Sequence, residues 1–417
     1  MSISRINLVV VGHKDHGKST LIGRLLYDSK AILEQKLEEI RTELKQTGKK
    51  FEFAFLLDSL EEERKGGLTI DIMQTPFKSK KYLYTIIDCP GHREFIKKML
   101  TGASQADAAV LVVSAKEGIQ NQTRQHTFLI KTLGVQQLVV VVNKMDEVAY
   151  GENQYQRTCN ELKQILKNLG YGDVPTIPIS AMKGDNVYKR SERMKWYKGA
   201  TLIETLDESI TPSKLPLNKP LRGVVQDVYR YENNQQIIAC KIETGTLKPR
   251  EKIIFNPSGK DGSLKKILAF GATKEEAEPG DSVGLLIDGI DTVERGEVLS
   301  HLENQPRNVK KFIAEIILLS DIQIKNSSEL TIRYGTSEKR CKVQRILSEI
   351  DPVNLTIRSK YPEILKDESV GEAEFLALEP VCIEKYSDFP QLGRFVIEGK
   401  KGTAAAGIVL EITELHR

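Results

Sequence analysis

A glycine-rich segment near the N-terminus constrains the fold of this chain more than any other feature. Residues 12–19 read GHKDHGKS and match the pattern G-x-x-x-x-G-K-[ST]. The apolar run 6–11 before it predicts a strand, and the spacing of apolar residues in 21–27 after it predicts a helix. In that context the glycines let backbone N–H groups turn toward phosphates, and the helix N-terminus adds its positive dipole end. The sequence therefore predicts a phosphate-binding loop.

Three residues in and near this loop are predicted to form a phosphate and metal site. Lys18 is expected to reach the β- and γ-phosphates of a nucleotide, and Ser19 to ligate Mg²⁺. Asp88 ends the apolar run 83–88, where an acidic residue beside the phosphate loop holds Mg²⁺ through water. An aspartate that ends a strand is common by itself, so its pairing with the loop is what favours the metal role.

The choice of base is indicated by a second loop. Asn143-Lys-Met-Asp146 follows the apolar run 138–142. Asp146 can accept from N1 and the exocyclic amine of guanine, while Asn143 bonds the other edge of the base. Adenine lacks that pair of donors and would leave Asp146 unpaired, which argues against a generic ATPase. The segment 180–182, after the run 176–179, would supply a backbone N–H to the guanine oxygen.

The first half of the chain alternates strand and helix patterns, which predicts βαβ units and a mostly parallel sheet. Expected strands are residues 6–11, 83–88, 108–114, 138–143 and 176–179, and expected helices are 21–27, 33–44, 94–100, 123–133 and 153–169. The second half differs. After a linker at 210–220 that contains Pro212, Pro216 and Pro220, short strand-like runs recur between turn residues and predict two β-barrels or sandwiches, with a junction near 304–308.

Composition narrows the class of protein without deciding it. The 417 residues are 40% hydrophobic and carry a net charge of +4, so the chain can bury cores and can accept a polyanionic partner without requiring one. Its five cysteines form no CxxC pair, which argues against a disulfide framework or zinc site. With neither a signal-like N-terminus nor an apolar run long enough for a membrane span, a cytoplasmic protein without membrane contact is expected.

Taken together, these motifs resemble the translational GTPase superfamily. The similarity is to the group that holds elongation factor one-alpha and the GTPase subunit of sulfate adenylyltransferase, on stretches 12–26, 51–71, 87–103, 142–146 and 184–202. The resemblance implies an α/β P-loop G domain followed by two all-β barrels, with domains at 1–212, 217–304 and 305–417. It also implies a switch that cycles between GTP and GDP with Mg²⁺.

The resemblance also assigns roles to individual residues. Thr69 falls on the switch threonine that touches Mg²⁺ and the γ-phosphate in the GTP state, and His92 on the histidine that orients the attacking water. Catalytic roles are expected for Lys18, Thr69 and His92, metal contacts for Ser19, Thr69 and Asp88, and nucleotide contacts for Asp15, His16, Gly17, Lys18, Ser19, Thr20, Gly91, Asn143, Lys144, Asp146, Ser180, Ala181 and Met182.

The sequence leaves two macromolecular partners open, because it departs from the family pattern at Lys14 and at residues 231–238. Lys14 stands where these factors usually carry valine, which suggests altered hydrolysis. Residues 231–238 contain no glycine, unlike the hairpin that shapes the aminoacyl pocket of elongation factor one-alpha, whereas 243–249 and 389–395 do resemble that factor. We expect a catalytic sulfate adenylyltransferase subunit as the first choice of partner and aminoacyl-tRNA with the ribosome as the alternative. A guanine-nucleotide exchange factor is expected in addition.

Overall fold

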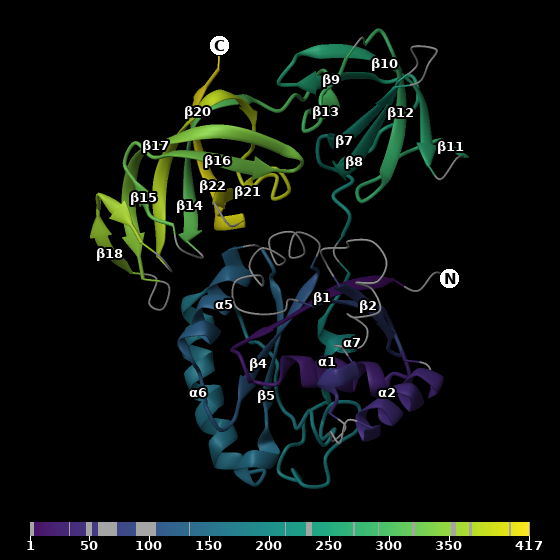
Figure 1. The fold of residues 1–417 in the computed structure, drawn as a ribbon, viewed down its shortest axis with the longest axis vertical. Coiled ribbons are helices and arrows are strands. Elements are labelled where there is room, and N and C mark those ends of the chain that lie inside the picture. Colours follow the sequence, from purple (N-terminus) through teal and green to yellow (C-terminus); the bar gives the residue numbers. More distant parts are fainter. Residues whose placement is uncertain are drawn as a thin grey trace. The chain divides into compact units, whose positions relative to one another are not determined.

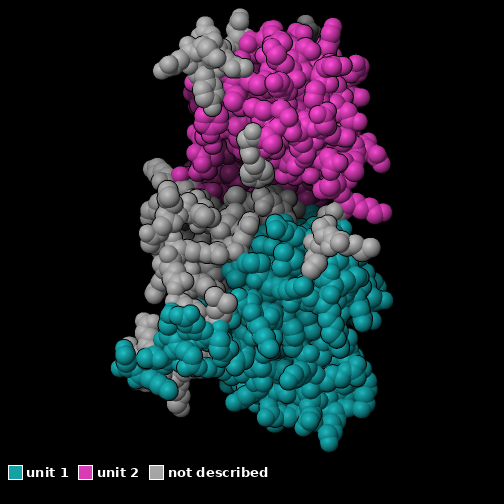
Figure 2. Space-filling model, turned by 90° about the vertical axis from the view of Figure 1, so that its right-hand side faces the viewer, with its two compact units in different colours: residues 1–213, 352–355 teal, residues 214–351, 356–417 magenta. Residues whose placement is uncertain are grey.

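The computed structural model divides into two compact units, residues 1–213 with 352–355 and residues 214–351 with 356–417 (Figure 2). Each unit is described by itself. The described residues are 4–32, 34–46, 52–56, 73–88, 106–132, 134–212, 214–230, 236–269, 272–290, 292–318, 322–351, 356–366, 369–399 and 402–416.

The first unit is built on one sheet, in which β1, β2, β4 and β5 are labelled in Figure 1. Its strand order is β2-β3-β1-β4-β5-β6. All neighbouring strands are parallel except β2 and β3. Every residue of β4 is buried, as the uninterrupted apolar run predicts for a strand covered on both faces. The strands are β1 (Arg5–Gly12), β2 (Met73–Lys78), β3 (Leu83–Asp88), β4 (Ala108–Ser114), β5 (Gln137–Asn143) and β6 (Thr176–Pro178).

Helices cover this sheet because their apolar residues fall on one side. In α1 the buried Leu21, Ile22, Leu25 and Leu26 recur at helical spacing and share a core cluster with alternate strand residues such as Val10. Residues of α2 and α7 join the same cluster, so these three helices pack on one face. The described helices are α1 (Lys18–Asp28), α2 (Glu34–Gln46), α5 (Asn121–Thr132), the 3-10 turn η1 (Met145–Val148), α6 (Glu152–Asn168) and α7 (Leu202–Ser209).

The second unit contains two closed antiparallel barrels. In the first, the order β11-β10-β12-β8-β7-β13-β9 is closed by pairing of β9 with β10, which leaves β11 as an appended edge. Val225, Ile242 and Phe255 fill its centre. Its strands are β7 (Arg222–Arg230), β8 (Gln236–Thr244), β9 (Lys252–Asn256), β10 (Lys260–Ala269), β11 (Ala272–Lys274), β12 (Ser282–Asp288) and β13 (Val298–His301).

The second barrel closes in the same way. Its order β16-β21-β22-β14-β20-β17-β18 is joined by pairing of β16 with β17, and Phe312, Phe375 and Phe395 pack together in its centre with ring centroids 5.2 to 5.7 Å apart. Its strands are β14 (Asn308–Leu318), β16 (Glu329–Tyr334), β17 (Ser337–Ile350), β18 (Ile357–Lys360), β20 (Val370–Cys382), β21 (Arg394–Gly399) and β22 (Gly402–Leu415), with β15 (Ile324–Lys325) and β19 (Ile364–Leu365) as a separate short pair.

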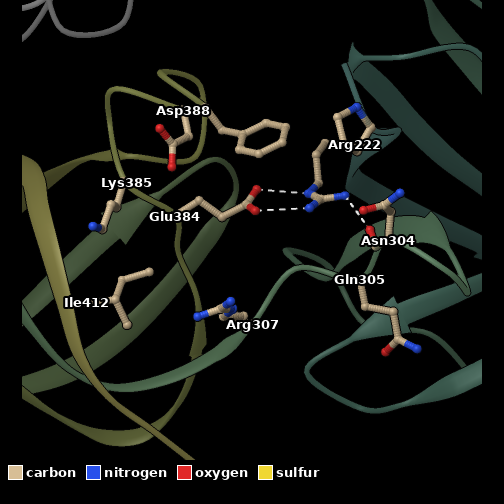
Figure 3. Close-up of a pocket in the computed structure, with 10 residues that line it drawn as sticks. Arg222, Asn304, Gln305, Arg307, Glu384, Lys385, Asp388 and Ile412 are labelled. Atoms are coloured by element: carbon tan, nitrogen blue, oxygen red, sulfur yellow. Dashed lines mark hydrogen bonds and ion pairs between the residues drawn. The ribbon is translucent and has the colours of Figure 1, made fainter. Parts of the chain in front are cut away.

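A buried ion pair joins the two barrels. The guanidinium of Arg222, on β7, donates to both carboxylate oxygens of Glu384 at 2.8 and 3.0 Å and to the carbonyl of Asn304 at 2.7 Å (Figure 3). The same guanidinium lies over the ring of Phe389, with its central carbon 4.7 Å from the ring centroid. Only 3% of Arg222 is exposed, so this charge depends on its partner from the other barrel.

The predicted fold class, a mostly parallel G domain followed by two β-barrels, is confirmed. The predicted helix at 94–100 lies outside the described residues, and β2 and α7 were not predicted. The domain boundaries at 1–212, 217–304 and 305–417 stay a proposal, in line with the ends of α7 and β13 and the starts of β7 and β14. None of the described helices is long and apolar enough to cross a membrane.

Candidate nucleotide site

The predicted loops meet at the carboxyl edge of the parallel sheet. Gly12, at the end of β1, lies beside Val112 of β4, and Ser114 at the end of β4 lies beside Asn143 at the end of β5. The loops after β1, β5 and β6 therefore emerge on the same edge. Open α/β sheets bind their ligands at this edge, where the strand order reverses, and β1 here has β3 on one side and β4 on the other.

The shape of the phosphate loop depends on two glycines with positive φ. Gly12 has a φ of 146° and Gly17 a φ of 90°. A Cβ atom at Gly12 would collide with the carbonyl of Val112, and one at Gly17 with the side-chain amide of Asn143. The motif glycines are thus required by both backbone conformation and close packing. Gly17 then caps α1, which begins at Lys18 and points its N-terminus at the loop.

Lys18 lies across the loop. Its ammonium donates to the carbonyls of Gly12 at 3.0 Å and His13 at 2.9 Å, which holds the charge over the backbone that would cradle phosphates. Ser19 is exposed at the start of α1 and Thr20 is half-buried next to it. Asp15 and Lys14 are exposed on the loop. The side chain of Lys14 is therefore not packed in the interior of the loop.

Asn143 connects the phosphate loop to the base loops. Its amide donates to the carbonyl of His16 at 2.9 Å, and its oxygen accepts from the backbone N–H of Ala181 at 2.9 Å. The side chain is 2% exposed. Sequence reasoning expected Asn143 at the edge of the base and missed this connection, because its partners are far away in the chain.

The base loop itself is held by Ser180. Its hydroxyl donates to one carboxylate oxygen of Asp146 at 2.6 Å and accepts from the N–H of Lys183 at 3.1 Å. In the described part of the chain, the other oxygen of Asp146 has no hydrogen bond. Met182 is 40% exposed beside it. The arrangement brings Asp146, Ser180, Ala181 and Met182 together, and leaves a carboxylate oxygen for a pair of donors such as those of guanine.

Lys144 has left-handed backbone geometry, with a φ of 62°. Its ammonium lies 3.6 Å from Glu117 and 3.7 Å from Glu147, so its long side chain extends across the loop that follows β4. Glu117 was not predicted as a site residue. Its only sequence signal is its place a few residues after an apolar strand, which many surface glutamates share.

The side chain of His16 is directed into the protein. It is fully buried, and its Nδ1 donates to the carbonyl of Val112 at 3.3 Å, which requires the proton on that nitrogen because a carbonyl oxygen only accepts. Burial lowers the pKa of His16 to about 4, so the ring is neutral near pH 7. Its 3.7 Å approach to Glu117 is therefore not an ion pair. The predicted nucleotide role of His16 stays untested.

The remaining predicted residues lie wholly or partly outside the described part of the chain. Thr69, Gly91 and His92 lie outside the described residues, and for Asp88 only the backbone is described, at the end of β3 next to β1. The exposed Ser19 hydroxyl and a carboxylate at this strand end are hard oxygen ligands of the kind that Mg²⁺ prefers. Among the described residues no group of three or more His, Cys, Asp or Glu is arranged to hold a metal by itself.

Comparison with known proteins decides the family. Residues 4–212 match the Elongation factor Tu GTP binding domain, 235–300 match Elongation factor Tu domain 2, and 311–410 match the GTP-eEF1A C-terminal domain-like family. The chain belongs to the elongation factor 1-alpha group of translational GTPases. It is 42% identical to Elongation factor 1-alpha of Thermoplasma acidophilum over 98% of both chains, and 42% identical to that of Methanocaldococcus jannaschii over 98% of this chain and 97% of the relative.

Membership in the elongation factor 1-alpha group establishes a GTP-binding protein and a GTPase, as predicted. The same relatives give no support to the sulfate adenylyltransferase prediction and favour its alternative, a translation elongation GTPase. A solved structure of sup35 complexed with GDP is 27% identical to this chain over 99% of this chain and 95% of that one, with a TM-score of 0.46.

Proposed function

We propose that this chain is a GTP-driven carrier that binds aminoacyl-tRNA in its GTP state and delivers it to the ribosome. The observation that carries the proposal is the similarity to Elongation factor 1-alpha, which extends over 98% of both chains and includes both barrels. The mild positive charge of the chain suits a polyanionic partner. A cytoplasmic location and a guanine-nucleotide exchange factor are part of the same proposal.

In this proposal the nucleotide lies across the carboxyl edge of the sheet. Lys18 and the backbone N–H groups around Gly17 would face the β- and γ-phosphates, while the unpaired oxygen of Asp146 would take the two donors of guanine. Ser19, Thr69 and Asp88 would hold Mg²⁺, which supplies neutralising charge for the phosphate oxygens. His92 would orient the attacking water. Asp15, Thr20, Gly91, Lys144, Ala181 and Met182 would complete the nucleotide contacts.

The transfer of the γ-phosphoryl group to water then acts as a switch. Loss of the γ-phosphate removes the group that Thr69 would touch, and a loop that is ordered only by that contact is released. Affinity for aminoacyl-tRNA would fall because the partner binds one state better than the other. A slow intrinsic rate is expected, since in this class a partner completes the hydrolytic site.

The direct test is binding of aminoacyl-tRNA to the full chain with GDP or with a non-hydrolysable GTP analogue. We expect tight binding with the analogue that weakens steeply with added salt, because phosphate contacts release counterions. Deacylated tRNA is the matched control and should bind much more weakly. Equal binding in both nucleotide states, or no preference for the aminoacylated form, would exclude a carrier of aminoacyl-tRNA.

A further inference from the structure

A cavity lies at the far end of α1 from the phosphate loop. Its volume is about 710 Å³, and the described residues that line it come from the second half of α1, the turn after it, and the loop 183–193. The segment 184–202 resembles the family in sequence, yet nothing in the proposed GTPase cycle uses it. The cavity is large enough for part of a nucleotide chain.

Cations dominate the lining of this cavity, which we call the basic pocket. They are Arg24, Lys30, Lys183, Lys189, Arg190 and Arg193. Three carboxylates also line it, so cations outnumber anions by two to one. A cavity lined mainly by one sign of charge concentrates ligands of the opposite sign.

Two of the three carboxylates are already engaged. Asp28 accepts from Arg24 at 2.8 Å. Asp185 lies 3.1 Å from Arg193 and also accepts from the hydroxyl of Ser191 at 2.7 Å. Their negative charge is therefore compensated by neighbours and is not directed at the other cations of the pocket.

The remaining cations lack such partners. Among the described residues, Lys30, Lys183, Lys189 and Arg190 form no ion pair, while the third carboxylate, Glu192, is exposed. Four positive charges thus surround one cavity with a single uncommitted carboxylate. All four side chains are exposed, and an anion bound in the cavity would compensate their like charges.

The loop that carries Lys189 and Arg190 is held in place. Asn186, which is 3% exposed, donates from its amide to the carbonyl of Pro178 at 2.9 Å and accepts from the N–H of Ser191 at 2.8 Å. Its backbone N–H donates to the carbonyl of Lys189 at 3.0 Å. Because the loop is already ordered, binding would cost little additional conformational entropy.

Aromatic rings complete the pocket and distinguish among anions. Tyr27 and Tyr188 line it as half-buried rings that also pack against the core of the unit. The guanidinium of Arg24 lies 4.9 Å from the ring centroid of Phe53 and 6.0 Å from that of Tyr27. Cations beside aromatic rings are typical of sites for single-stranded nucleic acid, where phosphates contact the charges and bases stack on the rings. An acidic peptide would use the charges but gain little from the rings.

We propose that the basic pocket binds a single-stranded segment of RNA, through its phosphates on Lys183, Lys189 and Arg190 and through a base on Tyr27 or Tyr188. The site is distinct from the phosphate loop and adjoins the base loop, where Ser180 accepts from the backbone N–H of Lys183. The proposal goes beyond delivery of aminoacyl-tRNA.

The test uses the full chain loaded with GDP and a labelled oligouridylate of about 12 nucleotides, a length within the site sizes of single-strand binders. Fluorescence anisotropy is recorded across a salt series for the unchanged chain and for Lys189→Ala/Arg190→Ala. Loss of two phosphate contacts should weaken binding about tenfold and reduce the slope of log K against log salt by about 1.4. The control is Lys163→Ala/Lys167→Ala, which removes the same charge from exposed positions on α6.

The proposal predicts that only the pocket variant changes the affinity and the slope, and that GDP affinity is the same in all three proteins. Equal loss in the control variant, or no loss in either, would show general electrostatic attraction and overturn it. Stronger competition by polyglutamate than by unlabelled oligouridylate would overturn it in favour of an acidic protein partner. Because the probe carries no amino acid and the chain holds GDP, failure here is distinct from failure of aminoacyl-tRNA binding.

Discussion

At the scale of single residues, the site combines side chains that read the ligand with side chains that shape the loops. Asp146 belongs to the first kind, because one of its oxygens is held by Ser180 and the other faces no donor in the described part of the chain. His16 belongs to the second, because its ring is buried under the loop and bonded to a strand carbonyl. Sequence motifs identify the first kind well. The second kind is recognised only when its packing is seen.

The substitution Asp146→Asn tests whether Asp146 recognises the guanine base. An amide at this position loses the charge and places a donor where guanine also donates, so two charge-assisted hydrogen bonds are lost. We expect affinity for GDP to fall at least about a hundredfold, and affinity for xanthosine diphosphate, which offers an acceptor there, to rise. Competition with a fluorescent nucleotide measures both. Asp173→Asn, at an exposed position of the same unit, is the control, and an unchanged GDP affinity would rule out Asp146 as the guanine ligand.

His16 makes the stability of the first unit depend on pH. Its folded pKa of about 4 lies below the ordinary 6.5, so the unfolded chain binds the additional proton first as pH falls. Stability should therefore drop between pH 6.5 and 4, by at most about 3 kcal/mol, and show no further loss from this group below pH 4. In His16→Gln this part of the pH dependence should vanish. Urea unfolding at several pH values measures it; an identical pH profile in His16→Gln would contradict the assignment.

At the scale of elements, the sequence predicted what is encoded locally. The runs 83–88 and 108–114 became β3 and β4 with those bounds. Strand β4 is buried at every residue, as expected for an apolar run covered on both faces. Strand β2 was missed because Pro76 argues against a strand, yet β2 is at the edge of the sheet, where proline is tolerated. Helix α7 was missed because it is short, although its capping signal, Thr201 followed by Glu204, was visible.

The start of α7 offers a test of that signal. Thr201 accepts from the N–H of Glu204 at 3.4 Å, and the Glu204 carboxylate accepts from the N–H of Thr201 at 2.9 Å. Thr201→Ala should lower the stability of the helix by about 1 kcal/mol, while Thr201→Ser should keep most of it. Hydrogen exchange of the α7 amides measures the difference. Equal protection in the Ala and Ser variants would mean that packing alone holds the helix.

At the scale of the whole chain, the contacts that matter most link residues far apart in sequence. Asn143 bonds groups of His16 and Ala181, and Arg222 bonds Glu384 across the two barrels. No local pattern predicts such pairs, because each depends on the completed fold. The three-part architecture could be predicted from motifs and strand spacing, whereas the buried ion pair between the barrels could not.

Removing one partner of this ion pair should destabilise the barrel unit strongly, whereas replacing both partners by apolar residues should change its stability little. Glu384→Ala leaves the Arg222 charge buried without its carboxylate, so the barrel unit should lose about 3–5 kcal/mol of stability. Arg222→Leu combined with Glu384→Leu removes both charges and should be close to neutral. Calorimetry of the full chain, with assignment of the barrel transition, compares the variants. If the double variant is as unstable as Glu384→Ala, the lost stability comes from the missing ion pair itself and not from the unpaired charge of Arg222.

The connection through Asn143 has a consequence for how nucleotide leaves. Since one buried amide is bonded to both the loop under the phosphates and the loop beside the base, displacement of one loop strains its connection to the other. A partner that displaces either loop would therefore lower the affinity of the whole site for the nucleotide. An exchange factor would therefore need to reach only one side of the site, and different partners could trigger release from different directions.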